Sequence, residues 1–302
     1  MLEVRNLRKV YESTVAVDDI SFSIPKGKIF GLLGPNGAGK TTTIRMLLNI
    51  LKPTSGEILR DGKLISSEFY NSTGYLPEER GLYKKSKVID VITYFAGLKG
   101  MSASDAAKRT DYWLSFLDIT QYRNRKIEEL SKGNQQKIQF IAAIVHDPAI
   151  LVLDEPFSGF DPVNQQVVKD LILTFANEGK ILILSTHQME LAEKLSSSIF
   201  LINKGKEIVS GELSEVKRKY GPNSVKLEYT GDGAFLTTHP DVVRADNYQN
   251  YSEVQLKSEA NPTLFLRSIV DKLEVRHFSV VEPTLHNIFI DLVKSSGDTV
   301  NE

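Results

Sequence analysis

The 302-residue chain contains no cysteine, and this absence excludes several kinds of site. Without thiols the chain forms neither a disulfide framework nor a thiolate metal site, which fits a reducing compartment. Its formal net charge is only −1. No basic excess therefore points to nucleic acid as a partner, and no acidic tail is present.

Long apolar runs are also missing. No stretch approaches the ~20 consecutive apolar residues that span a bilayer, so any membrane part has to come from another chain. The first five residues, Met-Leu-Glu-Val-Arg, indicate the start of a strand and not a signal peptide. Apolar residues still make up 41% of the chain, enough for a sizeable core and too many for wholesale disorder.

Residues 1–220 carry the pattern of an α/β domain. Short, wholly apolar segments at 150–153 and 181–184 alternate with helical segments such as 162–177. Strands of this kind are typical of a parallel sheet that is covered on both faces. Strand-type residues at 2–7 and 15–24 predict an additional small β layer at the N-terminus.

Helical periodicity predicts a separate group of helices within this domain. Apolar residues recur at helical spacing from about Val88 to Leu117, and another helix is expected from Ser131 to His146. We therefore expect a helical subdomain over about residues 85–145.

The composition changes after Tyr220. Residues 221–223, Gly-Pro-Asn, break the chain, and short alternating strand patterns then mix with two helical ones. This predicts a small α+β accessory domain over residues 221–302. Its polar last residues, 295–302, are expected to fray.

A glycine-rich segment, residues 34–41, matches the P-loop pattern of two glycines, a lysine and a hydroxyl residue. Its place between an apolar strand and a helix favours a phosphate site over an ordinary glycine-rich turn. Backbone N–H groups and the helix N-terminus bind anions there, Lys40 reaches the β- and γ-phosphates, and the Thr41 hydroxyl binds Mg²⁺. The predicted nucleotide-binding residues of this segment are Gly34, Pro35, Asn36, Gly37, Ala38, Gly39, Lys40, Thr41 and Thr42.

Two carboxylates follow the apolar strand 150–153. Beside the P-loop strand, this strand would deliver Asp154 to Mg²⁺ and place Glu155 where it polarises the attacking water. The alternative is that Asp154 and Glu155 only end the strand and are solvated, with no role in binding or catalysis. The P-loop upstream makes that alternative the less favoured one.

Residues 130–136, Leu-Ser-Lys-Gly-Asn-Gln-Gln, open a helix and closely resemble the ABC (ATP-binding cassette) signature, Leu-Ser-Gly-Gly-Gln. Lys132 replaces a glycine and Asn134 replaces the glutamine, while Ser131 and Gly133 keep their places. The resemblance implies that Ser131, Lys132 and Gly133 bind the γ-phosphate of an ATP molecule held by the opposite subunit.

Four further residues fall in the order that ABC cassettes show. Tyr11 stands where the family stacks an aromatic ring on adenine. Residues 74–78 resemble the Q-loop, with Glu78 in place of the usual glutamine; its carboxylate still accepts Mg²⁺ but adds negative charge. Asp161 belongs to a segment like the D-loop, which touches the partner subunit's site. His187 follows a strand, as the switch histidine does, and would help to hold the catalytic carboxylate.

The resemblance covers about residues 1–220 and implies a P-loop NTPase of the ABC type. The expected α/β fold has a mixed, mainly parallel core sheet, an N-terminal antiparallel β layer and a helical subdomain, followed by the small α+β domain. The implied function is an ATP-hydrolysing motor that closes around two Mg-ATP as a head-to-tail dimer. It drives a separate membrane permease from the cytoplasmic face of the cell membrane. Catalysis is assigned to Glu155, His187 and Lys40, with ATP and Mg²⁺ as ligands.

Two segments narrow the family further. Residues 283–289, Pro-Thr-Leu-His-Asn-Ile-Phe, and residues 79–83 resemble bacterial ATPases of the sodium-extrusion and multidrug or antibiotic export type. This resemblance implies an exporter, as a homodimer or paired with a sister ATPase.

Other functions remain as alternatives. A soluble ABC ATPase acting on ribosomes usually carries two cassettes, and this chain has one. A DNA-repair ATPase inserts a long coiled coil, for which the 90 positions from Lys40 to Leu130 (130 − 40) are too few. A kinase or GTPase needs neither the signature nor His187.

Overall fold

The computed structural model describes residues 1–79, 81–220, 223–257 and 259–295. Arg80, the predicted chain break at Gly221 and Pro222, and the C-terminal residues 296–302 lie outside the described residues. The chain divides into two compact units, Met1–Ser210 and Gly211–Glu302. No helix within the described ranges is long and apolar enough to span a membrane.

A six-stranded sheet forms the centre of the first unit, in the order β10-β9-β3-β8-β7-β6. Neighbouring strands from β9 to β6 run parallel. The inner strands β3, β7 and β8 are buried at every position, which explains why they are apolar except at the ends of β7 and β8. The six strands are β3 (Ile29–Leu33), β6 (Thr73–Leu76), β7 (Ile150–Asp154), β8 (Ile181–Thr186), β9 (Ser198–Asn203) and β10 (Lys206–Glu212).

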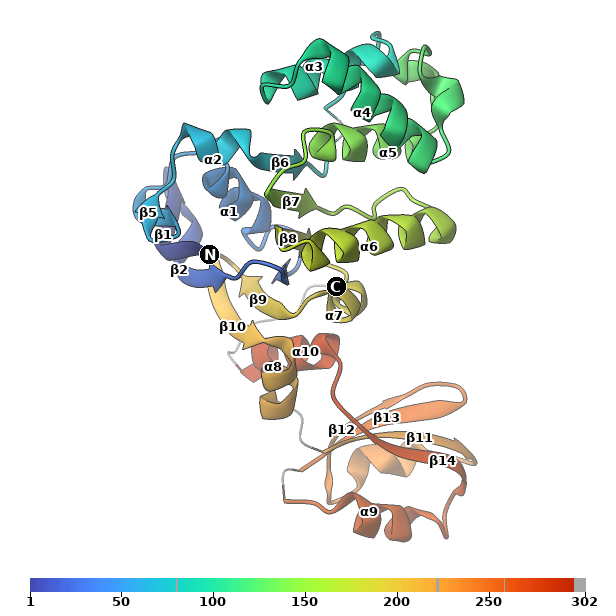
Figure 1. Ribbon diagram of the computed structural model, residues 1–302. Helices are drawn as coiled ribbons and strands as arrows, with labels where there is room; N and C mark the ends of the chain where they lie inside the picture. The colour runs from blue at the N-terminus through green and yellow to red at the C-terminus, as the bar shows by residue number, and fades with distance from the viewer. Residues whose placement is uncertain (80, 221–222, 258, 296–302) are drawn as a thin grey trace. The chain divides into compact units, whose positions relative to one another are not determined.

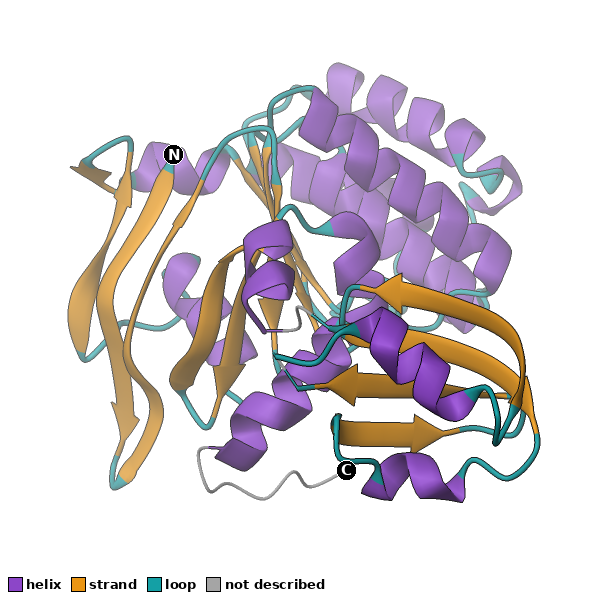
Figure 2. Ribbon diagram, turned by 90° about the horizontal axis from the view of Figure 1, so that it is seen from below, coloured by secondary structure: helices purple, strands orange, loops and turns teal. Residues whose placement is uncertain are grey.

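The two faces of this sheet support two separate cores, because successive side chains of a strand point to opposite faces. In β7, Leu151 and Leu153 join one core, whereas Ile150 and Val152 join the other. The first core packs against α3, α4, α5 and α6, and the second packs against α1 and the N-terminal layer (Figures 1 and 2). The helices of this unit are α1 (Lys40–Leu47), α2 (Ser67–Asn71), α3 (Val88–Leu98), α4 (Ala103–Phe116), α5 (Lys132–Ile144), α6 (Pro162–Asn177) and α7 (Met189–Leu195).

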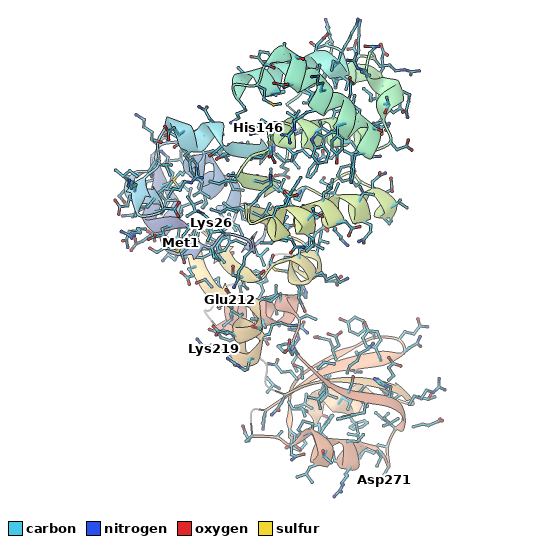
Figure 3. The ribbon with its side chains drawn as sticks, viewed as in Figure 1. Met1, Lys26, His146, Glu212, Lys219 and Asp271 are labelled. Atoms are coloured by element: carbon cyan, nitrogen blue, oxygen red, sulfur yellow. The ribbon has the colours of Figure 1, made fainter. Side chains whose placement is uncertain are left out.

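The N-terminal layer is an antiparallel sheet with the order β2-β1-β4-β5. Asp61, in the turn between β4 and β5, binds both the N-terminal amine of Met1 and the ammonium group of Lys26 (Figure 3). The four strands are β1 (Leu2–Tyr11), β2 (Thr14–Ile24), β4 (Ser55–Arg60) and β5 (Lys63–Leu64).

The second unit is a four-stranded antiparallel sheet with helices, in the order β12-β13-β11-β14. Val225, Leu227 and Phe265 are fully buried in its core. This unit begins at Gly211, ten residues before the boundary expected from the sequence, and so includes α8. Helix α8 belongs to it because it packs on α10. Its elements are α8 (Leu213–Tyr220), β11 (Ser224–Thr230), β12 (Val242–Asn247), β13 (Tyr251–Leu256), α9 (Pro262–Ile269), β14 (Glu274–Val281) and α10 (Leu285–Ser295).

The predicted α/β fold class is confirmed. The mainly parallel core sheet, the antiparallel N-terminal layer and the α+β second unit are all present. Residues 88–144 form α3, α4 and α5, which pack together as a helical group.

The second unit has a hydrophobic core of its own, so a substitution in that core should destabilise this unit and leave the first unit unchanged. Replacing the fully buried ring in Phe265→Ala is expected to destabilise this unit by roughly 3–5 kcal/mol, because the substitution leaves a cavity. Trp113 is the single tryptophan and lies in the first unit, so its fluorescence reports only on that unit. In urea titrations, circular dichroism should show an earlier partial transition while the Trp113 transition stays in place. An equal shift of both signals would contradict the prediction.

Candidate functional site

The loop between β3 and α1 is shaped by glycines that no other residue can replace without strain. Gly34, Gly37 and Gly39 have φ angles of 155°, 76° and 111°. A Cβ atom at Gly34 would lie 2.1 Å from the carbonyl oxygen of Ile202, whereas one at Gly37 would meet nothing within 4 Å. The loop is therefore packed on its inner side and open beside Gly37, as a phosphate cradle requires.

Lys40 begins α1 and is nearly buried, with 6% of its surface exposed. Its ammonium group donates hydrogen bonds to the carbonyl oxygens of Gly34 at 2.7 Å and Pro35 at 3.0 Å. Burial lowers the pKa of Lys40, and the nearby carboxylates of Glu155 and Asp154 oppose that shift. The cation is thus held inside the loop that it would serve.

Asp154 ends β7 with its carboxylate buried. Its Oδ2 atom accepts a hydrogen bond from the Thr41 hydroxyl at 3.1 Å. Burial raises the pKa of Asp154; the Ser185 and Thr41 hydroxyls oppose this shift, and the carboxylates of Glu78 and Glu155 reinforce it. Although the Ser185 hydroxyl is close, Oδ1 forms no hydrogen bond of good geometry with any described residue. A buried carboxylate oxygen left in this way suits a cation such as Mg²⁺.

Glu155 is held by contacts on both of its carboxylate oxygens. The Thr186 hydroxyl donates to Oε2 at 2.9 Å, and the His187 backbone N–H donates to Oε1 at 2.8 Å. The His187 Nδ1 atom lies 2.6 Å from the same Oε1. Glu155 has a φ of 48°, a conformation that non-glycine residues rarely adopt. Because β7 and β8 run parallel, Asp154 pairs with Ser185. The residues that follow them, Glu155 and Thr186, therefore also lie side by side.

A cleft of about 320 Å³ lies above these residues. It brings together the acids that follow β6 and β7 with the beginning of α1, and its open, polar surroundings fit both a nucleotide phosphate chain and a metal ion. Of its lining residues, only Ala16 was not predicted from the sequence. The lining residues are Ala16, Asn36, Gly37, Gly39, Lys40, Thr41, Thr42, Glu78, Asp154 and Glu155.

Several predicted residues are not among those that line this cleft: Tyr11, Gly34, Pro35, Ala38, Ser131, Lys132, Gly133, Asp161 and His187. Tyr11 ends β1 with its ring 44% exposed, and the Lys9 ammonium lies 5.1 Å from the ring centroid. Ser131 caps α5 by accepting a hydrogen bond from the Asn134 N–H at 3.3 Å, and Lys132 and Gly133 form the first turn of the same helix. Asp161 caps α6.

Helix capping accounts for the geometry of Asp161 within one chain. Its Oδ1 accepts the backbone N–H groups of Val163 and Asn164, each at 3.0 Å, and hydrogen bonding to Asn164 lowers its pKa. Such caps are ordinary helix-start chemistry. The role assigned to Asp161 and to residues 131–133 in a partner subunit's site stays a proposal.

His146, labelled in Figure 3, follows α5 and is not among the residues that line the cleft. Its Nε2 contacts the Thr73 carbonyl oxygen at 3.3 Å. Burial lowers the pKa of His146 to about 4, so the ring is neutral at physiological pH.

The buried charge of Asp154 is predicted to lower the stability of the folded protein, although the proposed metal site needs that charge. In metal-free protein above pH 7, Asp154→Asn is expected to raise the melting temperature by roughly 2–4 °C, the shift that 1 kcal/mol produces in a domain of this size. The raised pKa means that the ionised carboxylate destabilises the folded state above that pKa. The gain should therefore vanish as the pH falls below it and the carboxyl becomes neutral in both states.

Calorimetry in EDTA across a pH series measures this effect. Asp170→Asn, which changes an exposed carboxylate on α6, is the control and should leave the melting temperature unchanged. A lower melting temperature for Asp154→Asn at neutral pH would refute the prediction.

A family model described as "ABC transporter" matches residues 17–158, and one described as "ATP-binding protein DrrA1-3-like, C-terminal domain" matches residues 211–293. The ABC transporter ATP-binding protein YhaQ of Bacillus subtilis is 43% identical over 97% of this chain and 98% of its own length. The linearmycin resistance ATP-binding protein LnrL of the same organism is 30% identical over 97% of this chain and 98% of its own.

Solved structures agree with these matches. The ATP-binding subunit of an ABC transporter superposes with a TM-score of 0.68 at 27% identity, covering 73% of this chain and 93% of that one. A dimeric ATP-binding cassette bound to ADP and Pi has the same fold, with a TM-score of 0.65 at 21% identity over 70% of this chain and 99% of that one. By these matches and by its P-loop fold, the chain belongs to the ATP-binding proteins of ABC transporters, a family of ATPases.

Proposed function

We propose that this ABC ATPase is the motor of an exporter, closing as a head-to-tail pair around two Mg-ATP and driving a separate membrane permease. One observation carries the catalytic part of the proposal. The cleft joins a buried lysine, a metal-binding pair in Thr41 and Asp154, and a carboxylate fixed by Thr186 and His187.

In this proposal the P-loop holds the phosphates of ATP. The N–H groups of residues 34–39 and the N-terminus of α1 receive the phosphate oxygens, and Lys40 leaves the carbonyls of Gly34 and Pro35 to bind the β- and γ-phosphates. Thr41, Asp154 and Glu78 are the residues that would hold Mg²⁺. When bound, the metal neutralises charge on the phosphate oxygens.

Glu155 acts as the general base that orients the attacking water and accepts its proton. A base must be held in place, and the two hydrogen bonds from Thr186 and the His187 backbone leave its carboxylate little freedom. The His187 ring, whose side chain is 48% exposed, contacts Glu155 Oε1 through Nδ1 and in this proposal also meets the γ-phosphate.

The residues outside the cleft support a paired arrangement. Ser131, Lys132 and Gly133 begin α5, and a helix N-terminus with a hydroxyl cap binds anions. In a head-to-tail pair they would face the ATP of the opposite subunit, near Asp161. Tyr11 would stack on the adenine ring of its own subunit's ATP. ATP that contacts both subunits stabilises the closed pair, and hydrolysis reopens it.

Export and membrane attachment are supported by relatives. LnrL is named for linearmycin resistance, and a protein of Cupriavidus metallidurans that is 33% identical over 72% of both chains is named for Nod factor export. The second unit matches the DrrA-like C-terminal model. We therefore propose that the chain works at the cytoplasmic face of the membrane, with residues up to about 220 forming the nucleotide-binding domain and those from 221 to 302 an accessory domain.

The assignment of the base predicts the effect of Glu155→Gln. Its kcat for ATP should fall by at least about 100-fold, because the amide accepts no proton, while ATP binding is retained. A closed dimer should accumulate with Mg-ATP and elute earlier in size-exclusion chromatography. Glu178→Gln, an exposed change at the end of α6, is the control. Wild-type turnover in Glu155→Gln would exclude Glu155 as the base.

The partner is tested by a membrane pull-down from the native host. Tagged Glu155→Gln protein, trapped with Mg-ATP, should co-purify in mild detergent with a membrane protein of several spans, identified by mass spectrometry. The wild-type protein with ADP is the control and should recover less. Recovery of only ribosomal or DNA-bound proteins would overturn the transporter role and favour the alternative, an ABC ATPase acting on ribosomes or DNA.

A further inference from the structure

Gln139 connects the helix that begins at the signature with the segment that carries Glu78. It lies on α5 with 4% of its surface exposed. Its Nε2 donates hydrogen bonds to the carbonyl oxygens of Pro77 at 3.0 Å and Glu79 at 3.1 Å. These are the carbonyls on either side of Glu78. Among the described residues, no other hydrogen bond reaches either of them.

The position of Gln139 is otherwise one for an apolar side chain. Ile138, Phe140 and Ile141 beside it are fully buried in the core. The Oε1 atom of Gln139 is buried with no hydrogen-bond partner among the described residues. An unsatisfied buried acceptor is destabilising, so stability alone does not explain an amide at this place.

A second glutamine on the same helix provides a matched comparison. Gln135 also donates from Nε2 to two carbonyl oxygens, those of Ile127 at 3.1 Å and Leu130 at 3.0 Å. Gln135 thus fastens the segment that leads into its own helix, whereas Gln139 fastens the segment after β6. Helix α5 therefore carries two glutamines that each bind two backbone carbonyl oxygens, in different segments of the chain. We call each such pair of hydrogen bonds a clamp.

Glu78 depends on the backbone that Gln139 holds. Its side chain is exposed but lines the same cleft as Lys40 and Asp154, and its charge acts on the pKa of both. The described residues directly after β6, 77–79, belong to no helix or strand, so no ladder of backbone hydrogen bonds fixes where the carboxylate lies.

We propose that Gln139 is a positioning residue: by clamping both carbonyls beside Glu78, it sets where the Glu78 carboxylate meets the metal of bound Mg-ATP. The proposal rests on the proposed function, which gives Glu78 a role toward the metal. Gln139 also lies eight residues after Ser131, or about 12 Å along α5 at 1.5 Å per residue. One rigid helix therefore joins the clamp to the signature segment.

A double-mutant cycle with Mn²⁺ as the probe tests the clamp. Mn²⁺ affinity is measured by electron paramagnetic resonance in the presence of the ATP analogue AMP-PNP, with the full-length protein. Gln139→Met keeps the volume of the side chain and removes both donors. It should weaken Mn²⁺ binding by about 10-fold, the usual effect of losing a group that orients a metal ligand.

The coupling to Glu78 separates positioning from a general structural role. Glu78→Gln should also weaken Mn²⁺ binding, and the double variant should bind Mn²⁺ no more weakly than Glu78→Gln alone, because the clamp then has no carboxylate to place. Gln135→Met loses as many hydrogen bonds from the same helix. Its effect on Mn²⁺ affinity should be small and should add to that of Glu78→Gln.

The outcomes distinguish the clamp from the proposed function. If the wild-type protein does not bind Mn²⁺ with AMP-PNP, the proposed function fails. If it binds but Gln139→Met has wild-type affinity, or its effect adds fully to that of Glu78→Gln, the positioning role is overturned and the function stands. Should Gln139→Met fail to fold, Gln139→Glu, which keeps the shape and offers at most one donor, takes its place under the same criteria.

Discussion

The burial of carboxylates beside one ammonium group is the constraint on which the site depends. Asp154 ends a strand that is buried along its whole length and Glu155 follows it, so both charges lie in a poorly solvated place. Buried carboxylates require compensation from hydrogen bonds and opposite charge. Lys40, Thr41, Thr186 and the His187 backbone provide it. The parallel register of β3, β8 and β7 brings these compensating groups to one edge of the sheet.

The parts of this arrangement that sequence reasoning predicted have strong local causes. The predicted apolar runs 150–153 and 181–184 lie in β7 and β8, and α6 begins at Pro162 as predicted. The P-loop glycines are dictated by backbone angles and contacts that a Cβ atom would violate. Where one local requirement fixes the residue type, the sequence is informative.

Other features depend on contacts between distant segments and leave little local signal. Strand β6 has four residues and includes Gly74, so neither length nor alternation indicates it. The sequence analysis assigns no role to Thr186. Its position at the end of a parallel strand, directly before His187, could have indicated one. Gln139 occurs in an apolar stretch with nothing nearby to indicate that its partners lie about 60 residues earlier. Helix α8 has one buried residue, Val216, which is too weak a pattern to extend the second unit.

The Lys40 ammonium group donates two hydrogen bonds to carbonyl oxygens of its own loop, those of Gly34 and Pro35. An anion that binds the Lys40 ammonium group must replace both of these hydrogen bonds, at 2.7 Å and 3.0 Å, with stronger ones. A chain of phosphates offers several charged oxygens to the ammonium group, whereas a single phosphate held elsewhere in the cradle offers few. Under the proposed function, the phosphate chain of a nucleotide would therefore compete for this ammonium group better than a single phosphate or a small anion would.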